Sequence, residues 1–195
     1  MPGKFIVLEG LDRSGKTTQC AKIAEELRKS HSNVVEMKFP DRTTAIGKLI
    51  NDYLVNHEFE LNDQAIHLLF SANRWEVSTK IKALISEGAI IVADRYVYSG
   101  IAFSSAKGLD IDWCAAPDRG LPEPDVVLFL DVDEQTAISR GGYGLERYET
   151  KEMQEKVRQQ FLKLKTPTWH WILASGSADE VFARIKESIK LHIDI

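Results

Sequence analysis

The chain has 195 residues, a length that fits one compact domain. Apolar residues make up 44% of the sequence and charged residues 28%, a balance that allows a buried core and argues against a disordered chain. The formal net charge is −4 and the basic residues are dispersed among acidic ones, so no polybasic stripe predicts a nucleic acid or a membrane as partner.

Five short apolar runs, rich in β-branched and aromatic residues, predict β-strands. They span residues 5–9, 34–39, 89–94, 125–131 and 169–173. Amphipathic stretches with a period of about 3.6 residues predict helices between and after these strands. The helices span residues 17–28, 45–55, 63–87, 151–165 and 179–192. Because strands that are apolar throughout must be buried on both faces, the alternation predicts an α/β fold with three layers, a five-stranded parallel sheet flanked by helices.

Turn residues separate these elements and give no sign of a second domain. Gly88 closes a predicted helix, and the run GGYG at residues 141–144 is typical of a flexible hinge. We therefore expect a single domain that spans residues 1–195 and carries a short lid at about 141–149.

Cysteine spacing and the absence of targeting signals indicate the compartment. Cys20 and Cys114 stand far apart, without the C-x-x-C or Cys/His spacing of a zinc site. The first residues lack the pattern of a secretory signal, and no apolar run approaches the roughly 20 residues that a membrane-spanning helix needs. We expect a cytoplasmic protein with reduced cysteines, and the nucleus is the alternative.

The stretch GLDRSGKTT at residues 10–18 matches the phosphate-binding motif G-x-x-x-x-G-K-[ST]. It follows a predicted strand and opens a predicted helix, which is the context that a P-loop requires. Its glycines let backbone N–H groups face an anion, and the helix N-terminus adds a partial positive charge. In a P-loop NTPase fold, Lys16 would reach the β- and γ-phosphates of ATP, and the Thr17 hydroxyl would bind Mg²⁺. The alternative is a tight strand-to-helix turn with an exposed lysine.

A P-loop does not define the reaction, because GTPases, motors and kinases share it. The guanine-reading motif N-K-x-D of a GTPase is absent, and the chain is too short for the coupled domains of a motor. A small phosphotransferase is therefore the leading class. Two alternatives remain open: a deoxynucleoside kinase that phosphorylates thymidine, and a regulatory protein that only senses ATP.

Charged and aromatic residues near the strand ends predict a second nucleotide site. Asp94 and Arg95 end the third strand and Arg42 follows the second, so their side chains should meet at the carboxyl edge of the sheet. Asp94 suits the magnesium shell, and a guanidinium can grip two oxygens of a phosphate. Phe70 and Arg74 share one helix face, where the ring can stack on a base and the cation can donate to a ring carbonyl.

Together these segments resemble the thymidylate kinases (dTMP kinases) of the eukaryotic type, which are P-loop nucleoside monophosphate kinases. The resemblance spans most of residues 5–165 and rests on FIVLEGLDRSGKTTQ, KFPDRTTAIGKLI, HLLFSANRWE, VADRYVYSGIAFSSAKGLDIDWC, GLPEPDVVLFLDV and GLERYE. It implies transfer of the ATP γ-phosphoryl group to dTMP, giving ADP and dTDP for dTTP synthesis, with Mg²⁺ as cofactor. It also implies a homodimer packed through helices, which would use the second apolar face of the helix predicted at 63–87.

The resemblance implies the following site residues. The catalytic residues are Arg13, Lys16, Asp94 and Arg95, and the Mg²⁺ ligands are Thr17 and Asp94. The residues expected to bind ATP are Gly10, Ser14, Gly15, Lys16, Thr17, Thr18 and Arg140. The residues expected to bind dTMP are Asp12, Phe39, Arg42, Phe70, Arg74, Arg95, Ser99, Gly100, Tyr148 and Gln154.

Some of these residues carry a more specific role by the same resemblance. Asp12 approaches the 3′-hydroxyl of the dTMP sugar, whereas Arg13 reaches the phosphoryl group in transfer. Tyr148 lies against the deoxyribose 2′-carbon, Gln154 lies near the base, and Arg140 stacks on adenine.

The lid sequence GGYGLERYE has Arg140 and Arg147 at its edges and no arginine at its tip. This pattern fits the version of the family that carries an arginine in the P-loop. His170 lies in the last predicted strand between two tryptophans, so we expect a structural histidine and assign it no role in the site.

Overall fold

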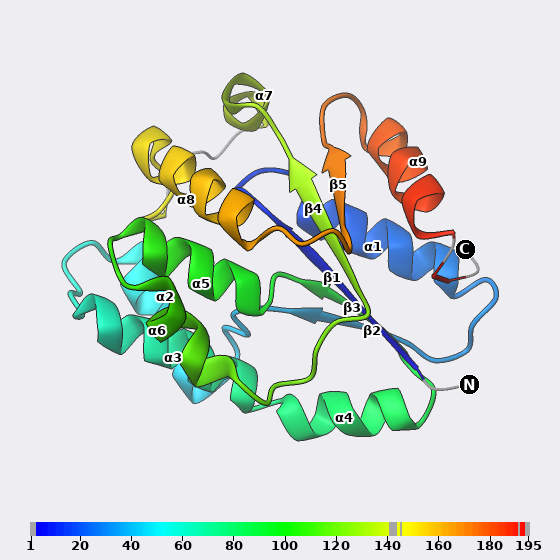
Figure 1. Ribbon diagram of the computed structural model, residues 1–195, viewed down its shortest axis with the longest axis horizontal. Coiled ribbons are helices and arrows are strands. Elements are labelled where there is room, and N and C mark those ends of the chain that lie inside the picture. Colours follow the sequence, from blue (N-terminus) through cyan, green and yellow to red (C-terminus); the bar gives the residue numbers. More distant parts are fainter. Residues whose placement is uncertain (1–2, 141–143, 145, 191, 194–195) are drawn as a thin grey trace.

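The computed structural model describes residues 3–140, 144, 146–190 and 192–193. Its centre is an all-parallel sheet of five strands in the order β2-β3-β1-β4-β5 (Figure 1). The strands are β1 (Lys4–Gly10), β2 (Val34–Lys38), β3 (Ile90–Asp94), β4 (Val126–Asp131) and β5 (Trp169–Leu173). Each boundary lies within one residue of the predicted run, and the predicted α/β class is confirmed.

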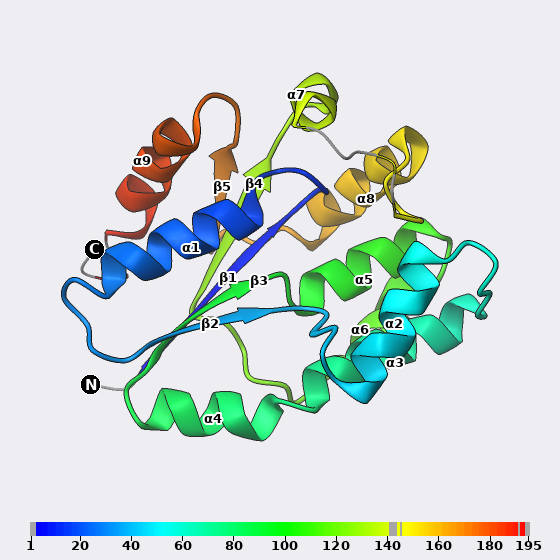
Figure 2. The same cartoon turned by 180° about the vertical axis from the view of Figure 1, so that it is seen from behind.

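Helices cover the sheet and extend beyond its carboxyl edge. They are α1 (Lys16–Leu27), α2 (Ala45–Val55), α3 (Asp63–Trp75), α4 (Ser78–Ser86), α5 (Val97–Ala106), α6 (Ile111–Ala115), α7 (Glu134–Ser139), α8 (Lys151–Leu164) and α9 (Ala178–Ile189). α1 and α9 pack together on the face turned to the viewer in Figure 2. α2, α3, α5 and α6 form a group at the end of the sheet where β2 and β3 stop. No helix built from the described residues is long and apolar enough to cross a membrane.

The central strand β1 shows why the sheet needs a layer on each side. Ile6 and Leu8 cluster with residues of α1, whereas Phe5 and Val7 cluster with Ile81 of α4. All five of these side chains are fully buried. Because successive side chains of a strand point to opposite faces, this division places α1 and α4 on opposite sides of β1.

The prediction of a single helix at 63–87 is wrong, because this segment forms two helices, α3 and α4. Val77 separates them with a non-helical backbone, φ −111° and ψ 3°. Ile66 of α3 is buried in the cluster around α2, whereas Ile81 of α4 is buried against the sheet. The two helices have different packing partners. This difference explains part of the reason why the segment 63–87 has more apolar residues than one face of a single helix would need.

Helix α5 was missed by the sequence analysis, as were the short helices α6 and α7. The α5 sequence VYSGIAFSSA contains small and apolar residues on all sides, because the helix packs against α3, α6 and α8. A helix that is buried all round shows no 3.6-residue alternation. Its start is held by the carboxylate of Glu9, which accepts the backbone N–H groups of Tyr96 and Ser99 at 3.0 and 3.1 Å.

Candidate active site

The loop between β1 and α1 forms the phosphate-binding end of the site. Gly15 precedes the helix with φ 94°, a left-handed conformation that residues with a Cβ rarely adopt. The Lys16 side chain folds back over the loop, where Nζ donates to the Leu11 carbonyl at 2.5 Å and to the Ser14 hydroxyl at 3.2 Å. Burial, together with the charge of Arg95, lowers the pKa of Lys16 to about 8. The loop therefore holds a poorly hydrated ammonium group that an anion would stabilise.

Thr17 and Asp94 bring two oxygen ligands together at the start of α1. The pairing of β1 with β3 aligns Leu8 with Asp94 and so places the end of β3 beside the P-loop. The Thr17 hydroxyl donates to a carboxylate oxygen of Asp94 at 2.5 Å. Hydroxyl and carboxylate oxygens fit the predicted Mg²⁺. The described residues contain no group of three or more His, Cys, Asp and Glu that could hold a metal ion.

An open cavity of about 600 Å³ begins at the P-loop and runs along the carboxyl edge of the sheet. The predicted site residues that line it are Asp12, Arg13, Ser14, Gly15, Lys16, Thr17, Thr18, Phe39, Arg42, Phe70, Arg74, Asp94, Arg95, Ser99, Gly100, Arg140 and Tyr148. Gly10 and Gln154 are not among its lining residues. The Gly10 carbonyl instead accepts a hydrogen bond from Arg95 at 2.9 Å.

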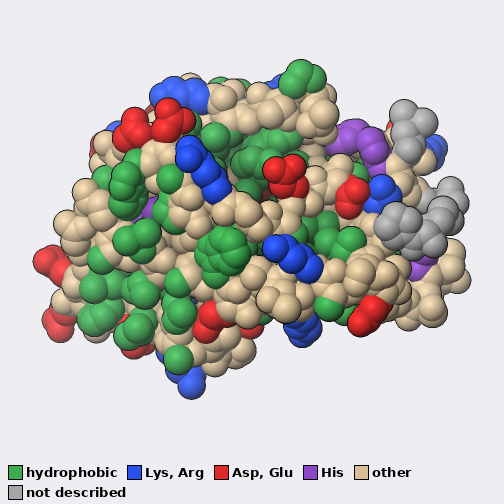
Figure 3. All heavy atoms as spheres, turned by 60° about the horizontal axis from the view of Figure 1, so that its bottom comes forward, with side chains coloured by type: hydrophobic (Ala, Val, Ile, Leu, Met, Phe, Trp, Pro, Cys, Tyr) green, Lys and Arg blue, Asp and Glu red, His purple; other side chains and the backbone are tan. Residues whose placement is uncertain are grey.

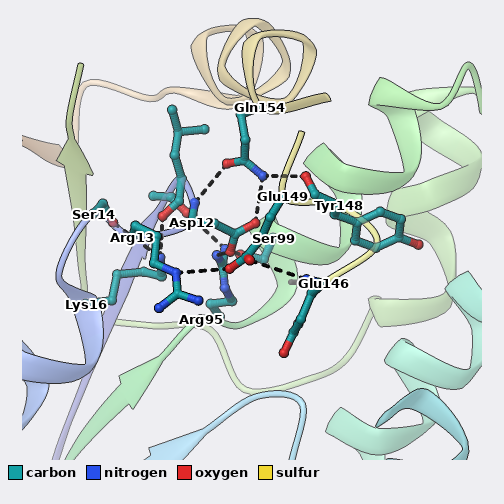
Figure 4. A network of polar contacts seen from close by, with 12 residues as sticks. Asp12, Arg13, Ser14, Lys16, Arg95, Ser99, Glu146, Tyr148, Glu149 and Gln154 are labelled. Carbon is teal, nitrogen blue, oxygen red and sulfur yellow. Dashed lines mark hydrogen bonds and ion pairs between the residues drawn. The ribbon is translucent and has the colours of Figure 1, made fainter. Parts of the chain in front are cut away.

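Asp12 is the centre of a polar network that joins the P-loop to β3 and α8 (Figure 4). One carboxylate oxygen accepts from Arg95 Nη2 at 2.5 Å and the other accepts from Gln154 Nε2 at 2.6 Å. The Asp12 backbone N–H donates to Gln154 Oε1 at 2.9 Å, so Gln154 lies behind Asp12. Arg95 has φ 67°, an unfavourable conformation for a residue with a side chain. The network thus fixes the direction of the Arg95 guanidinium within the cavity.

Two glutamates of the sequence ERYE enter the site, and the sequence analysis did not predict them. Glu149 accepts from Arg13 Nε at 3.1 Å, and Glu146 forms an ion pair with Arg42 at 2.8 Å. These carboxylates occupy guanidinium donors that a phosphate group would use. Both glutamates lie in the segment predicted to be a lid, and that position is the signal that could have revealed them. Residues 141–143 and 145 of the predicted lid lie outside the described residues.

An aromatic ring and a guanidinium group, both on α3, form the end of the cavity that lies away from the P-loop. Phe70 is half-buried, and the Arg74 guanidinium binds the Asp118 carboxylate through Nε at 3.2 Å and Nη2 at 2.6 Å. Asp118 lies at the end of a short 3₁₀ helix and was missed by the sequence analysis. Its position, 44 residues after Arg74, offers no local spacing signal.

Tyr148 closes the side of the cavity between these two ends. Its ring lies against Phe103 and Tyr53, with centroid distances of 5.6 and 6.0 Å. Its hydroxyl bonds to the Tyr53 hydroxyl at 3.3 Å and accepts from Lys107 at 3.2 Å. Burial raises the pKa of Tyr148, so the phenol stays neutral. Arg147 turns away from the cavity and donates to the Tyr53 carbonyl at 2.9 Å.

Arg140 and the segment before α9 form the opposite end of the cavity. Arg140 donates to the carbonyls of Arg13 at 2.9 Å and Ala174 at 2.5 Å, so it bridges the P-loop and the segment after β5. Gly176 and Ala178 also line the cavity, although the sequence of this region predicted only a strand and a helix. The cavity therefore has a P-loop near one end, guanidinium groups at its centre and an aromatic pocket at the other end.

Comparison with known proteins identifies close relatives. The profile of the Thymidylate kinase family matches residues 8–185. The thymidylate kinase of Schizosaccharomyces pombe is 58% identical over 163 residues, which are 84% of this chain and 77% of that protein. The human thymidylate kinase is 44% identical over 188 residues, with 94% and 88% of the two chains covered.

A solved structure extends this similarity to three dimensions. The thymidylate kinase from Candida albicans is 44% identical to this chain and superposes with a TM-score of 0.91. The match covers 97% of this chain and 92% of the other.

Proposed function

This chain belongs to the thymidylate kinase family, and we propose that the cavity described above is where it transfers the γ-phosphoryl group of ATP to dTMP, giving ADP and dTDP. The observation that supports this site is the presence of a P-loop and two additional guanidinium groups, Arg42 and Arg95, in one cavity. A site that binds only ATP has no need for cations beyond the P-loop on the acceptor side.

ATP is proposed to place its phosphates on the P-loop and its base beside Arg140. The buried Lys16 ammonium group supplies positive charge to the β- and γ-phosphates. Thr17 and Asp94 would hold the Mg²⁺ ion, which spreads positive charge over the phosphate oxygens when it is bound. Backbone N–H groups at the start of α1 complete the cradle.

The dTMP phosphate is proposed to lie between Arg42 and Arg95. An acceptor phosphate is already an anion, so the enzyme must position it and neutralise repulsion between the two substrates rather than remove a proton. Asp12 holds Arg95 in place for this task. Arg13 is the cation nearest the transferring group in this proposal, and it would exchange its contact with Glu149 for the phosphoryl oxygens.

The thymine base is proposed to stack on Phe70, with a ring carbonyl accepting from Arg74. Tyr148 would then lie beside the deoxyribose, where a 2′-hydroxyl would collide with its ring. Gln154 supports this region indirectly, because its amide also donates to the Tyr148 carbonyl at 2.9 Å.

The second copy of the chain in a homodimer is proposed to cover an apolar face built from α2, α3 and α6. Figure 3 shows hydrophobic side chains gathered on this side of the molecule. Leu49, Leu68 and Trp113 are 46%, 47% and 38% exposed there. Exposed apolar side chains from three adjacent helices are typical of a protein interface.

A coupled assay of ADP release tests the proposed reaction. We expect turnover with ATP and dTMP, and none above background with thymidine, which lacks the phosphate that Arg42 and Arg95 would bind. Arg95→Ala should lower kcat by about a thousandfold, by analogy with arginine fingers, and leave the Kd for ATP unchanged. Absence of ADP release with dTMP would reject the reaction, and intact turnover in Arg42→Ala and Arg95→Ala would reject the acceptor site.

A further inference from the structure

Arg74 lies in the cavity wall as half of a buried ion pair. Its side chain is 3% exposed and that of Asp118 is 4%. Such a pair is weak evidence for stability, because desolvation of the two charges offsets most of their attraction. A buried pair that borders a ligand cavity therefore calls for an explanation other than stability.

Two further residues restrict the same ion pair. Ser71, one turn before Arg74 on α3, donates to Asp118 Oδ1 at 2.7 Å and so holds the carboxylate. On the other side lies Gly100 of α5, where a Cβ would stand 2.7 Å from Arg74 Nη2 and 2.9 Å from Nη1. The guanidinium thus lies directly against the α5 backbone, and a larger residue at position 100 would displace it.

We propose that Asp118 is a positioning residue that fixes the orientation of Arg74 and thereby sets the preference of the enzyme for a pyrimidine with a 4-carbonyl group over one with a 4-amino group. This inference rests on the proposed function, in which Arg74 donates to thymine. Asp118 accepts from the N–H of Nε and from one N–H of Nη2, which leaves the second N–H of Nη2 and both N–H groups of Nη1 as donors for a base.

The chemistry of the guanidinium explains the selectivity. Arginine has only donors, so it favours the 4-carbonyl of thymine and opposes the 4-amino group of cytosine, which is itself a donor. Discrimination between the two bases requires a donor with a fixed orientation, because a mobile donor could rotate away from the 4-amino group of cytosine. A guanidinium bound by Asp118 on one side and packed close to Gly100 on the other meets this condition.

Steady-state kinetics of Asp118→Asn with dTMP and dCMP test the proposal. The asparagine keeps the size of the side chain and removes its charge and one acceptor oxygen. Since a hydrogen bond to a charged group contributes about tenfold or more to affinity, we expect kcat/KM for dTMP to fall by at least about tenfold, mainly through KM. The KM for ATP should not change, and the ratio of kcat/KM for dTMP to that for dCMP should fall.

Asp131→Asn is the matched control. Asp131 forms the same kind of bidentate ion pair with Arg158, in which Arg158 Nε and Nη2 lie 3.1 and 2.9 Å from the Asp131 carboxylate oxygens. Neither residue lines the nucleotide cavity. This variant should leave the dTMP to dCMP ratio at the wild-type value. Asp118→Asn combined with Arg74→Gln should change the ratio no more than Arg74→Gln alone, because Asp118 acts through Arg74.

Equal losses with dTMP and dCMP in Asp118→Asn would show a merely structural role and overturn the inference. If that variant does not fold, Ser71→Ala replaces it, and it should give a smaller fall in the same ratio; an unchanged ratio counts against the inference. Wild-type protein without activity on dTMP would overturn the proposed function and this inference together. Wild-type preference for dTMP that persists in Asp118→Asn would overturn the inference alone.

Discussion

Lys16 illustrates how the fold changes the chemistry of a single side chain. The side chain is 6% exposed, and its ammonium group satisfies two of its donors within the P-loop itself. Burial disfavours the charged form, as does the neighbouring Arg95, so the pKa falls to about 8. Bound phosphates would reverse this effect, because negative charge favours the ammonium form.

The affinity for ATP should therefore depend on pH through Lys16. The free protein loses the Lys16 proton as the pH rises through about 8, while the complex with phosphates retains it. We expect a constant Kd for ATP below pH 7.5 and a Kd that rises toward about tenfold per pH unit above pH 8.5. Titration calorimetry between pH 7 and pH 9.5 measures this. A flat profile across this range would mean that Lys16 keeps its ordinary pKa near 10.5.

Helix α5 shows how one buried acid can organise an element. Glu9 is fully buried at the end of β1 and accepts from the N–H groups of Tyr96 and Ser99 and from the Ser99 hydroxyl. A carboxylate at a helix start also meets the positive end of the helix dipole. Ser99 in turn accepts from Arg95 at 2.8 Å, so Glu9 links the P-loop strand to the proposed acceptor end of the site.

Glu9→Ala should destabilise the protein by about 2–4 kcal/mol, because two buried backbone donors lose their partner. Urea unfolding followed by circular dichroism measures the change in free energy. Glu36→Ala is the control, since Glu36 forms an exposed pair with Arg28 and should change stability by less than about 1 kcal/mol. Equal effects of the two substitutions would contradict the role assigned to Glu9.

At the scale of the whole molecule, the proposed active site and the proposed interface share helices. α3 carries Phe70 and Arg74 toward the cavity and Leu68 toward solvent. Dimer formation would therefore cover the outer surface of a helix whose inner surface lines the proposed base pocket. In a homodimer, this arrangement would connect the stability of the proposed pocket with the oligomeric state.

Light scattering after size exclusion should give the mass of two copies of the 22.0-kDa chain. Leu68→Glu should shift the mass to that of one chain at micromolar concentration, because it places a charge in the apolar face. The control is Leu173→Glu on the edge strand β5, where Leu173 is 59% exposed and lies away from this face. A monomer mass for the wild type would reject the homodimer.

Much of the fold could be predicted from local sequence. The strand runs, the P-loop spacing and the helices at α1, α2, α8 and α9 each depend on residues that are neighbours in the chain. Part of the candidate site followed in the same way, because the P-loop motif and the carboxyl ends of parallel strands predict that Lys16, Asp94 and Arg95 lie together. Other expected site residues, such as Tyr148 and Gln154, came from the resemblance to a known family. Motif and periodicity are properties of short segments, and they can be read without tertiary contacts.

The pairing of charges in the site depends on contacts between residues that are far apart in the chain. Asp118 reaches Arg74 from 44 residues away, and Glu149 reaches Arg13 from 136 residues away. Packing in the folded chain also determines that residues 63–87 form two helices and that α5 is a helix, because both outcomes depend on which surface each segment packs against. Contacts between distant residues carry no periodic signal along the chain, so the folded arrangement alone determines how the cations of the site are paired and aimed.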